Sequence, residues 1–144
     1  MGYKGGCLCG AVRYTVNADP LVTRMCWCRD CQKFGAGSAT VNAIFPSEAV
    51  HIEGVMGDYE SIAASGNVMH RGFCPKCGTP ITTASEALPH VLGIRVGTLD
   101  NQGLFSPDIV IWTRSAPDWA CIDPDLEAYE GQPPAPARAK DEQA

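Results

Sequence analysis

The sequence contains no hydrophobic run of the roughly 18 residues that a membrane-spanning helix requires. Its best apolar segment, residues 90–96, has the length of a strand and carries an arginine, Arg95. The start of the chain also lacks the apolar stretch of a secretory signal peptide, and Gly6 stands where a myristoylation signal requires Ser or Thr. We therefore expect a soluble, cytoplasmic protein with no membrane partner.

Positive charge is scarce, because 11 basic residues stand against 16 acidic ones and give a formal net charge of −5. A general nucleic-acid binder usually carries a basic excess that displaces counterions from the phosphates, so we expect no nucleic-acid partner. The hydrophobic content of 45% is sufficient for a packed core, and a length of 144 residues is typical of one domain.

Long helices are not expected either, because 15 glycines and 11 prolines interrupt the chain. Only two short segments favour a helical turn, residues 29–34 and 124–129. Short segments that alternate apolar and polar residues recur instead, which is the pattern of half-buried strands. The predicted strands are residues 11–16, 39–45, 49–53, 69–73, 90–96 and 108–113. The sequence therefore predicts a mainly β fold.

The predicted domain covers residues 1–130. Residues 131–144 contain no large apolar side chain, and such a segment buries too little surface to offset the entropy lost on ordering. We therefore predict a mobile Pro/Ala-rich tail over residues 131–144. Exposed strand edges of a small β domain leave a homodimer open as an alternative to a monomer.

Eight cysteines are the most informative residues of the chain. Without an export signal, this number favours metal or redox chemistry over a disulfide scaffold. Cys7 and Cys9 lie on one face of an extended segment, and Cys74 and Cys77 form a Cys-x-x-Cys knuckle. Four thiolates complete a tetrahedral site, so we predict a structural zinc on these cysteines. A thioredoxin-like redox pair is the alternative for the knuckle, but no βαβ pattern surrounds it.

A third motif places Cys26, Cys28 and Cys31 close together with no obvious fourth ligand nearby. An open coordination position is typical of a catalytic zinc, because substrate or water can occupy it. Thiolate ligands also tolerate a further thiolate, which stays deprotonated and nucleophilic. We therefore predict a catalytic zinc on these cysteines and a small-molecule thiol as the substrate. A redox-sensing site that releases its zinc on oxidation is an alternative.

Three basic residues near this motif, Arg24, Arg29 and Lys33, are opposed only by Asp30 and favour the binding of a small anion such as a substrate carboxylate. The alternative, which has about equal weight, is that these residues are solvated surface charges with no ligand. We expect Cys121 to be a small buried hydrophobic residue rather than a ligand. The histidines at 51, 70 and 90 are assigned structural or surface roles, and the tryptophans at 112 and 119 are assigned to core packing before pocket lining.

Together these motifs resemble the glutathione-dependent formaldehyde-activating enzyme (GFA) family, which includes centromere protein V. The resemblance covers residues 5–121, and its segments are residues 6–14, the cysteines at 26, 28 and 31, and residues 35–37, 73–81, 97–100 and 115–119. It implies a small antiparallel β fold held by zinc, similar to a Rab-associated zinc protein, with a structural zinc on Cys7, Cys9, Cys74 and Cys77 and a catalytic zinc on the remaining motif. It also implies that glutathione adds to formaldehyde to give S-hydroxymethylglutathione, a carbon–sulfur lyase reaction.

One residue departs from the family pattern. Members often carry a histidine between the first two cysteines of the catalytic motif, where this sequence has Trp27, so we expect a more apolar pocket and leave the exact substrate open. We predict a zinc-dependent carbon–sulfur lyase that adds glutathione or a similar thiol to formaldehyde or a related small carbonyl compound, with the second zinc site fully or partly occupied. The alternatives are a non-catalytic zinc module for a protein partner and a redox-sensing zinc–thiolate protein.

Overall fold

The computed structural model describes residues 2–135, so residues 136–144 of the predicted tail lie outside the described residues. The helix α1 spans Arg29–Phe34, as the sequence predicts. Four short 3-10 helices are η1 (Ser47–Ala49), η2 (Val96–Thr98), η3 (Gln102–Leu104) and η4 (Thr113–Ser115). The strands are β1 (Tyr3–Gly6), β2 (Arg13–Val16), β3 (Val22–Cys26), β4 (Thr40–Pro46), β5 (Val50–Glu53), β6 (Gly57–Ile62), β7 (Val68–Phe73), β8 (Pro80–Ser85), β9 (Val91–Arg95), β10 (Ile109–Ile111) and β11 (Glu127–Ala128). Within residues 2–135, no helix has the length and apolar character needed to cross a membrane.

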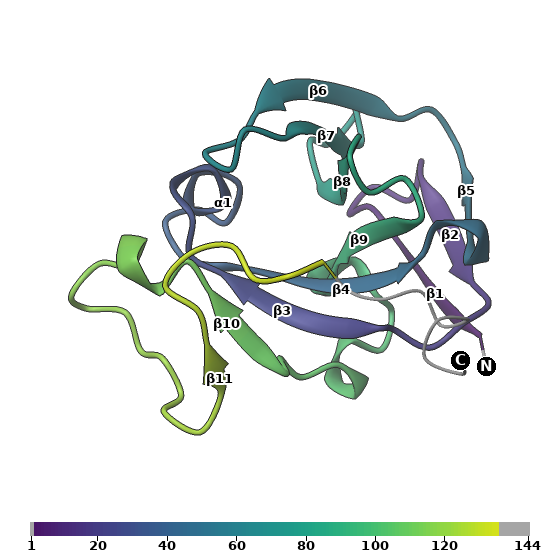
Figure 1. Ribbon diagram of the computed structural model, residues 1–144. Coiled ribbons are helices and arrows are strands. Elements are labelled where there is room, and N and C mark those ends of the chain that lie inside the picture. Colours follow the sequence, from purple (N-terminus) through teal and green to yellow (C-terminus); the bar gives the residue numbers. More distant parts are fainter. Residues whose placement is uncertain (1, 136–144) are drawn as a thin grey trace.

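The strands form two sheets (Figure 1). The smaller sheet has three strands in the order β1-β2-β5, and the larger has eight in the order β11-β10-β3-β4-β9-β8-β7-β6. Neighbouring strands are antiparallel, except that β10 runs parallel to both β3 and β11. The predicted mainly β, antiparallel fold is confirmed. The two parallel pairings were not predicted, because alternation within a strand carries no information about its neighbour's direction.

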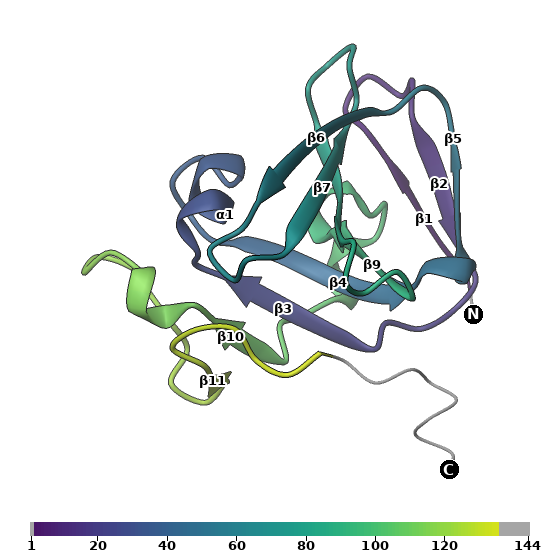
Figure 2. The same ribbon diagram turned by 45° about the horizontal axis from the view of Figure 1, so that its top comes forward.

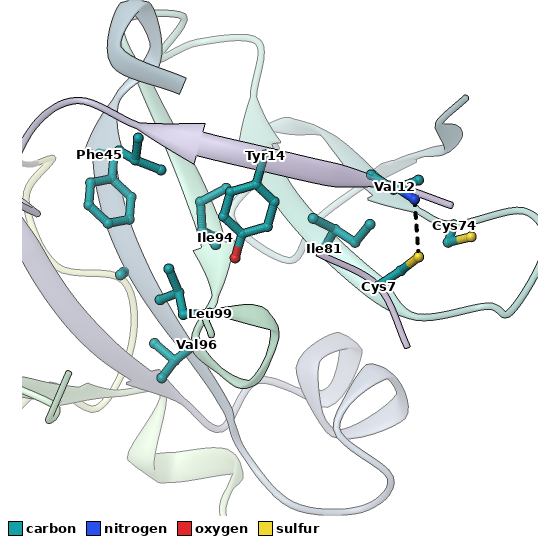
Figure 3. Packing of buried hydrophobic residues seen from close by; sticks show 11 residues of the cluster. Cys7, Val12, Tyr14, Phe45, Cys74, Ile81, Ile94, Val96 and Leu99 are labelled. Carbon is teal, nitrogen blue, oxygen red and sulfur yellow. Dashed lines mark hydrogen bonds between the residues drawn. The ribbon is translucent and has the colours of Figure 1, made fainter. Parts of the chain in front are cut away.

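The main hydrophobic core lies between the two sheets (Figure 3). β2 alternates exposed and buried residues, and its inward side chains Tyr14 and Val16 pack with Phe45 of β4 and Ile94 of β9. Tyr14 is 2% exposed and the other three side chains are fully buried. The Tyr14 hydroxyl lies 2.7 Å from the Thr98 hydroxyl oxygen, so the buried phenol has a hydrogen-bond partner. This contact links the smaller sheet to η2, the 3-10 helix that follows β9.

The six predicted strands are present, with ends shifted by one or two residues. The predicted helical turn at residues 124–129 is wrong, because this segment contains a turn followed by β11. The Asp125 N–H donates to Asp123 Oδ1 over 2.9 Å, and aspartate that binds nearby backbone in this way favours a turn over a helix. The Tyr129 N–H then donates to the Val110 carbonyl oxygen over 2.9 Å, which aligns β11 with β10.

The other face of the larger sheet is concave. The sheet curls so that β6 and β7 lie over β3 and β4, with α1 at one end of the space between them (Figures 1 and 2). In the strand register Arg24 pairs with Asn42, and Asn42 pairs with Arg95. Two strands further on, Arg71 pairs with Thr83. Paired residues project from the same face of a sheet, so the concave face carries these polar side chains among apolar ones such as Ile44 and Met69, whereas the opposite face packs in the main core.

The start of the predicted tail contacts the domain. The Trp112 N–H donates to the Gly131 carbonyl oxygen over 3.3 Å, and Trp112 Nε1 donates to Gln132 Oε1 over 3.0 Å. Pro133 is buried. The chain therefore remains packed against the domain beyond the predicted boundary at residue 130.

Candidate metal centres and the adjoining cavity

Four cysteines from two distant turns meet at one point and are called here the four-cysteine group. Cys7 and Cys9 come from the turn between β1 and β2, and Cys74 and Cys77 come from the turn between β7 and β8. The sulfur atoms are 3.6 Å apart for Cys7 and Cys9, and 3.8 Å apart for Cys9 and Cys74. A tetrahedron with metal–sulfur bonds of about 2.3 Å has edges of about 3.8 Å. The group therefore fits a zinc ion held by four thiolates.

Residues beside these cysteines hold the two turns in place. Gly10 and Gly78 each follow the second cysteine of a pair and have φ angles of 83° and 79°, which residues with side chains adopt only with strain. Thr79 Oγ1 accepts the Leu8 N–H over 3.1 Å and lies 3.1 Å from Cys77 Sγ, so it bridges the turns. The hydrogen bond from Thr79 lowers the pKa of Cys77 to about 5, which favours the thiolate that binds a metal.

The four-cysteine group lies at the margin of the core. Figure 3 shows Cys7 and Cys74 close to Val12, whose N–H donates to Cys7 Sγ over 3.2 Å. Cys74 is fully buried, and Cys7 is 7% exposed. None of the four cysteines lines the cavity described below. A metal ion here has a complete protein ligand set and no room for substrate, which is the arrangement of a structural site.

Cys26, Cys28 and Cys31 form the three-cysteine group, at the end of β3 and the start of α1. Cys28 caps the helix, because its Sγ accepts the Cys31 N–H over 3.2 Å. Hydrogen bonds from Cys26 and Cys28 lower the pKa of Cys31 to about 2, whereas the contacts of Cys26 with Cys28 and Cys31 raise its own pKa. Sulfur atoms this close cannot all ionise unless a cation lies among them. The donor set therefore fits a metal ion.

A cavity of about 200 Å³ opens on the three-cysteine group. All three cysteines form part of its wall, and residues of β4, β7, β8 and β9 form much of the rest. Within the described part of the chain, no fourth His, Cys, Asp or Glu joins this group. A metal ion on these sulfur atoms would keep a coordination position for a small molecule, and the cavity provides the space for one.

The family model described as glutathione-dependent formaldehyde-activating enzyme matches residues 2–115. The matched region contains both cysteine groups and every described cavity-lining residue except Gln132. The chain belongs to this family. No curated protein sequence matches it.

The fold of this GFA-family chain is similar to that of a Rhodobacter sphaeroides protein whose crystal structure comes from structural genomics. The TM-score is 0.56 with 23% sequence identity, and the match covers 72% of this chain and 96% of that chain. At this identity the likeness shows the fold alone.

The three basic residues named in the sequence analysis have different surroundings in this family member. Arg24 is half-buried and lines the cavity, and burial lowers its pKa. Arg29 is exposed at the cavity wall, and its Nη1 donates to Gln32 Oε1. Lys33 is exposed and is not among the cavity-lining residues. Arg24 is therefore the best placed of the three to meet an anion inside the cavity.

The sequence analysis missed two further arginines of the cavity, Arg71 and Arg95. Both line the cavity, and they are only 5% and 7% exposed. The available signal was an arginine inside a predicted strand, in residues 69–73 and in residues 90–96. A charge that a strand carries into the interior needs a partner there. Trp112 packs against the buried cluster of Cys26, Cys31 and Ile111 and also lines the cavity, so it fits both of its interpretations.

Three expectations from the sequence are wrong. Cys121 is exposed rather than buried, although it does lie outside both cysteine groups. Trp119 is 69% exposed rather than packed in the core, and its ring makes an edge contact with Trp27 at 6.3 Å between centroids. Trp27 is 3% exposed and is not among the cavity-lining residues. The departure from the family pattern therefore alters packing around the motif, and does not make the cavity wall more apolar.

A third group of possible ligands, Glu60, His70 and Glu86, lies on the outer face of β6–β8. His70 Nδ1 lies 2.7 Å from Asp58 Oδ2, and His70 Nε2 lies 2.6 Å from Glu86 Oε2. Both ring nitrogens already have carboxylate partners. We therefore assign these residues to a surface charge cluster rather than to a metal site.

Proposed function

We propose that this chain is a zinc-dependent carbon–sulfur lyase that adds a thiol such as glutathione to formaldehyde or a related small carbonyl compound. The observation that carries the proposal is the three-cysteine group, which has no fourth protein ligand within the described residues and forms part of the wall of a cavity. Membership of the GFA family supports the same chemistry. The four-cysteine group is proposed to hold a second, structural zinc.

Zinc held by Cys26, Cys28 and Cys31 would lower the pKa of a substrate thiol, so that its sulfur is a nucleophile at neutral pH. In the addition, a bond forms between that sulfur and the carbonyl carbon, the carbonyl π bond opens, and the oxygen takes up the proton that the thiol released. The part of the protein is to hold both reactants together in the cavity, which removes much of the entropy cost of their encounter.

The basic residues are proposed to bind the carboxylates of the thiol substrate. Arg24 meets a ligand inside the cavity, Arg29 meets it at the wall, and Lys33 contributes charge at the surface. The proposed partner is thus a small, anionic thiol. The expected cytoplasmic location and the absence of a nucleic-acid partner remain proposals. A homodimer would form through β6 or β11, the outer strands of the larger sheet, and light scattering of the purified protein tests it.

The test compares wild type, Cys28→Ser and Cys121→Ser. The rate at which glutathione adds to formaldehyde is measured above the spontaneous rate, and native mass spectrometry counts the bound zinc ions and detects a glutathione adduct. We expect two zinc ions, an adduct and acceleration for wild type and for Cys121→Ser, whose cysteine is exposed and lies outside both groups. Cys28→Ser is expected to keep one zinc and the fold but to lose the acceleration.

A zinc-loaded protein without lyase activity would favour one of the two alternative functions, a non-catalytic zinc module or a redox sensor. If protein with two zinc ions accelerates neither this addition nor those of related carbonyl compounds, the lyase proposal is wrong and a non-catalytic zinc module is favoured. Reversible zinc loss from the three-cysteine group on mild peroxide treatment, again without turnover, would favour a redox sensor.

A further inference from the structure

One side of the cavity is bounded by the chain that follows β11. Residues 129–133, called here the strap, continue past the end of β10 (yellow in Figures 1 and 2). Of the described residues that line the cavity, Gln132 alone lies beyond residue 115, where the family match ends. Membership of the family therefore says nothing about the strap, and the function proposed above gives it no role.

Backbone hydrogen bonds and packing hold the strap in place. Three N–H groups that follow β10 donate to carbonyl oxygens of the strap, Trp112 to Gly131 over 3.3 Å, Thr113 to Tyr129 over 3.1 Å and Arg114 to Glu130 over 3.4 Å. Tyr129 packs against the buried cluster that contains Cys26 and Cys31, and Pro133 is buried. Gln132, between them, is exposed. The strap is therefore fixed at both ends and reaches solvent in between.

A hydrogen bond between two side chains closes the strap over the cavity. Trp112 Nε1 donates to Gln132 Oε1 over 3.0 Å, although 20 residues separate them in the sequence. Both residues line the cavity, and Trp112 is half-buried whereas Gln132 is exposed. The pair therefore lies where the cavity meets solvent, and the hydrogen bond joins the end of β10 to the strap at this border.

The backbone of Trp112 is strained, and the strap stabilises it. Its φ and ψ angles are 59° and 38°, in the left-handed region that a bulky residue adopts only at a cost. Such a conformation persists where surrounding contacts fix it. Here the strap accepts the Trp112 N–H, and the Arg114 guanidinium carbon lies 5.5 Å from the centroid of the Trp112 ring. Arg114 Nε in turn donates to the Glu130 carbonyl oxygen over 2.9 Å. If the strap opens, these contacts are lost together, and the strain favours movement of the ring away from the cavity wall.

We infer that Trp112 and Gln132 form a gate that determines, by size, which molecules reach the three-cysteine group. The cavity encloses only about 200 Å³, so a small molecule enters while the gate is closed and a larger one enters only when the strap opens. The inference rests on the proposed function only in taking the three-cysteine group as the place of reaction. Trp112 and Gln132 determine specificity and take no part in bond formation.

The test uses two neutral reagents of different size, methyl methanethiosulfonate and benzyl methanethiosulfonate. A cysteine thiolate attacks the sulfur that carries the methyl or benzyl group, a disulfide forms and methanesulfinate leaves, so the reagents differ only in the group that they transfer. Peptide mass spectrometry gives the initial rates at the three-cysteine group and at Cys121, which is exposed and serves as the reference within the same molecule. We expect wild type to prefer the methyl reagent more strongly at the three-cysteine group than at Cys121.

Two variants open the gate in different ways. Gln132→Ala and Trp112→Phe each remove the hydrogen bond between the two side chains, and Trp112→Phe keeps an aromatic ring. Each should raise the benzyl rate at the three-cysteine group about 2-fold to 10-fold, the usual effect of one hydrogen bond on an opening equilibrium, and change the methyl rate less than about twofold. Hydrogen exchange at the amides of residues 112–114 should rise with it. Gln102→Ala, at an exposed position, and Trp119→Phe, whose ring is exposed and does not line the cavity, are the matched controls.

The ratio of the methyl rate to the benzyl rate decides the outcome. A smaller ratio at the three-cysteine group in both variants, with both controls unchanged, supports the gate, whether or not the protein accelerates the addition of a thiol to formaldehyde. Failure of the proposed function is thus distinguished from failure of the gate. An unchanged ratio in both folded variants overturns the inference, even if amide exchange rises, because the strap then opens without limiting access. Methyl and benzyl rates that rise by the same factor also overturn it, because they indicate a general loosening of the fold.

Discussion

His70 lies between two carboxylates on the outer face of β7. Asp58 and Glu86 contact its two ring nitrogens, and Glu60 lies directly across the strand pair. Hydrogen bonds to Glu86 and Asp58 raise the pKa of His70 to about 9, from an ordinary value of 6.5. Because the pKa is higher in the folded state, the stabilisation is complete below about pH 6.5 and is lost as the pH rises through about 9.

We expect His70→Gln to lower the free energy of unfolding at pH 6 and to have little effect at pH 10. The reason is that wild type holds a protonated imidazole between carboxylates only at the lower pH, whereas glutamine is neutral throughout. Urea unfolding of both proteins at several pH values measures the difference. The difference should shrink at high salt, because these groups are solvent-accessible and their interaction is screened. A difference that is constant across pH would show that the loss comes from packing rather than from charge.

The candidate site could be predicted from the sequence only where its residues are close along the chain. Cys26, Cys28 and Cys31 were found because local spacing alone brings their sulfur atoms together. Arg71 and Arg95 reach the same cavity from strands separated by β8, and they do so because the sheet curls. Sheet curvature depends on packing between distant strands, so no local pattern reports it. The signal in the sequence was an arginine within a predicted strand, and this signal does not show which residues face the arginine across the cavity.

At the scale of elements, β1 is held against the rest of the molecule by a close approach at Gly5. A side-chain carbon at this position would collide with the Tyr14 hydroxyl and the Thr98 carbonyl oxygen. Gly5 also forms an isolated bridge with Leu99. Glycine is therefore required at this position because there is no space for a side chain, and not because of an unusual backbone angle.

We expect Gly5→Ala to destabilise the protein by about 1–3 kcal/mol, the usual cost of forcing an extra group into a packed interface. The Tyr14–Thr98 hydrogen bond must open or β1 must shift to admit the methyl group. Chemical denaturation measures the loss. Gly97→Ala is the control, because an added carbon there meets no atom within 4 Å. Equal stability of the two variants would mean that β1 is free to move outward at no cost.

The helix α1 is anchored by one buried side chain. Gln32 is 6% exposed, and its Nε2 donates to the Trp27 carbonyl oxygen over 2.8 Å and to the Ser115 carbonyl oxygen over 2.9 Å. A helix of six residues has too few internal hydrogen bonds to be stable alone. Gln32 therefore links the segment of the three-cysteine group to η4, which follows β10 in the sequence.

We expect Gln32→Leu to lower the free energy of unfolding by about 1–3 kcal/mol, because two carbonyl oxygens lose their donor. Zinc should also leave the three-cysteine group more readily, since the start of α1 loses its anchor. Denaturation and zinc release measured together test both effects. Gln102→Leu, at an exposed position of η3, is the control. A Gln32→Leu protein that matches this control in both measurements would contradict the anchoring role.

Sequence reasoning predicted six of the eleven described strands, those that alternate apolar and polar residues between turn residues, and missed β1, β3, β6, β8 and β11. β2 shows the alternation directly, with Tyr14 and Val16 buried and the residues between them exposed. β6 was missed because it is an outer strand whose residues are mostly exposed, so it has no apolar face to detect. β11 has only two residues, and its existence depends on pairing with β10 rather than on its own sequence.

At the scale of the whole molecule, the four-cysteine group joins the two sheets. Cys7 and Cys9 follow β1 of the smaller sheet, and Cys74 and Cys77 follow β7 of the larger. Cys9 and Cys74 are separated by 65 residues. A metal ion on this group would therefore close a long loop and hold one sheet over the core that lies between the two. Structural zinc contributes roughly 10–16 kcal/mol of apparent binding energy, as much as the whole stability of a typical domain.

With zinc bound to both cysteine groups, as proposed above, the groups should respond differently when a chelator is added in steps. We expect the three-cysteine group to lose zinc first, because its open position is accessible to the chelator, and the protein should then be inactive but folded. The four-cysteine group should lose zinc later, and unfolding should accompany that loss. Native mass spectrometry counts the zinc ions while circular dichroism follows the fold, and Cys28→Ser should show only the second step. Protein that stays folded without any zinc would mean that the core alone holds the sheets together, and the four-cysteine group would then have to be assigned a role other than structural support.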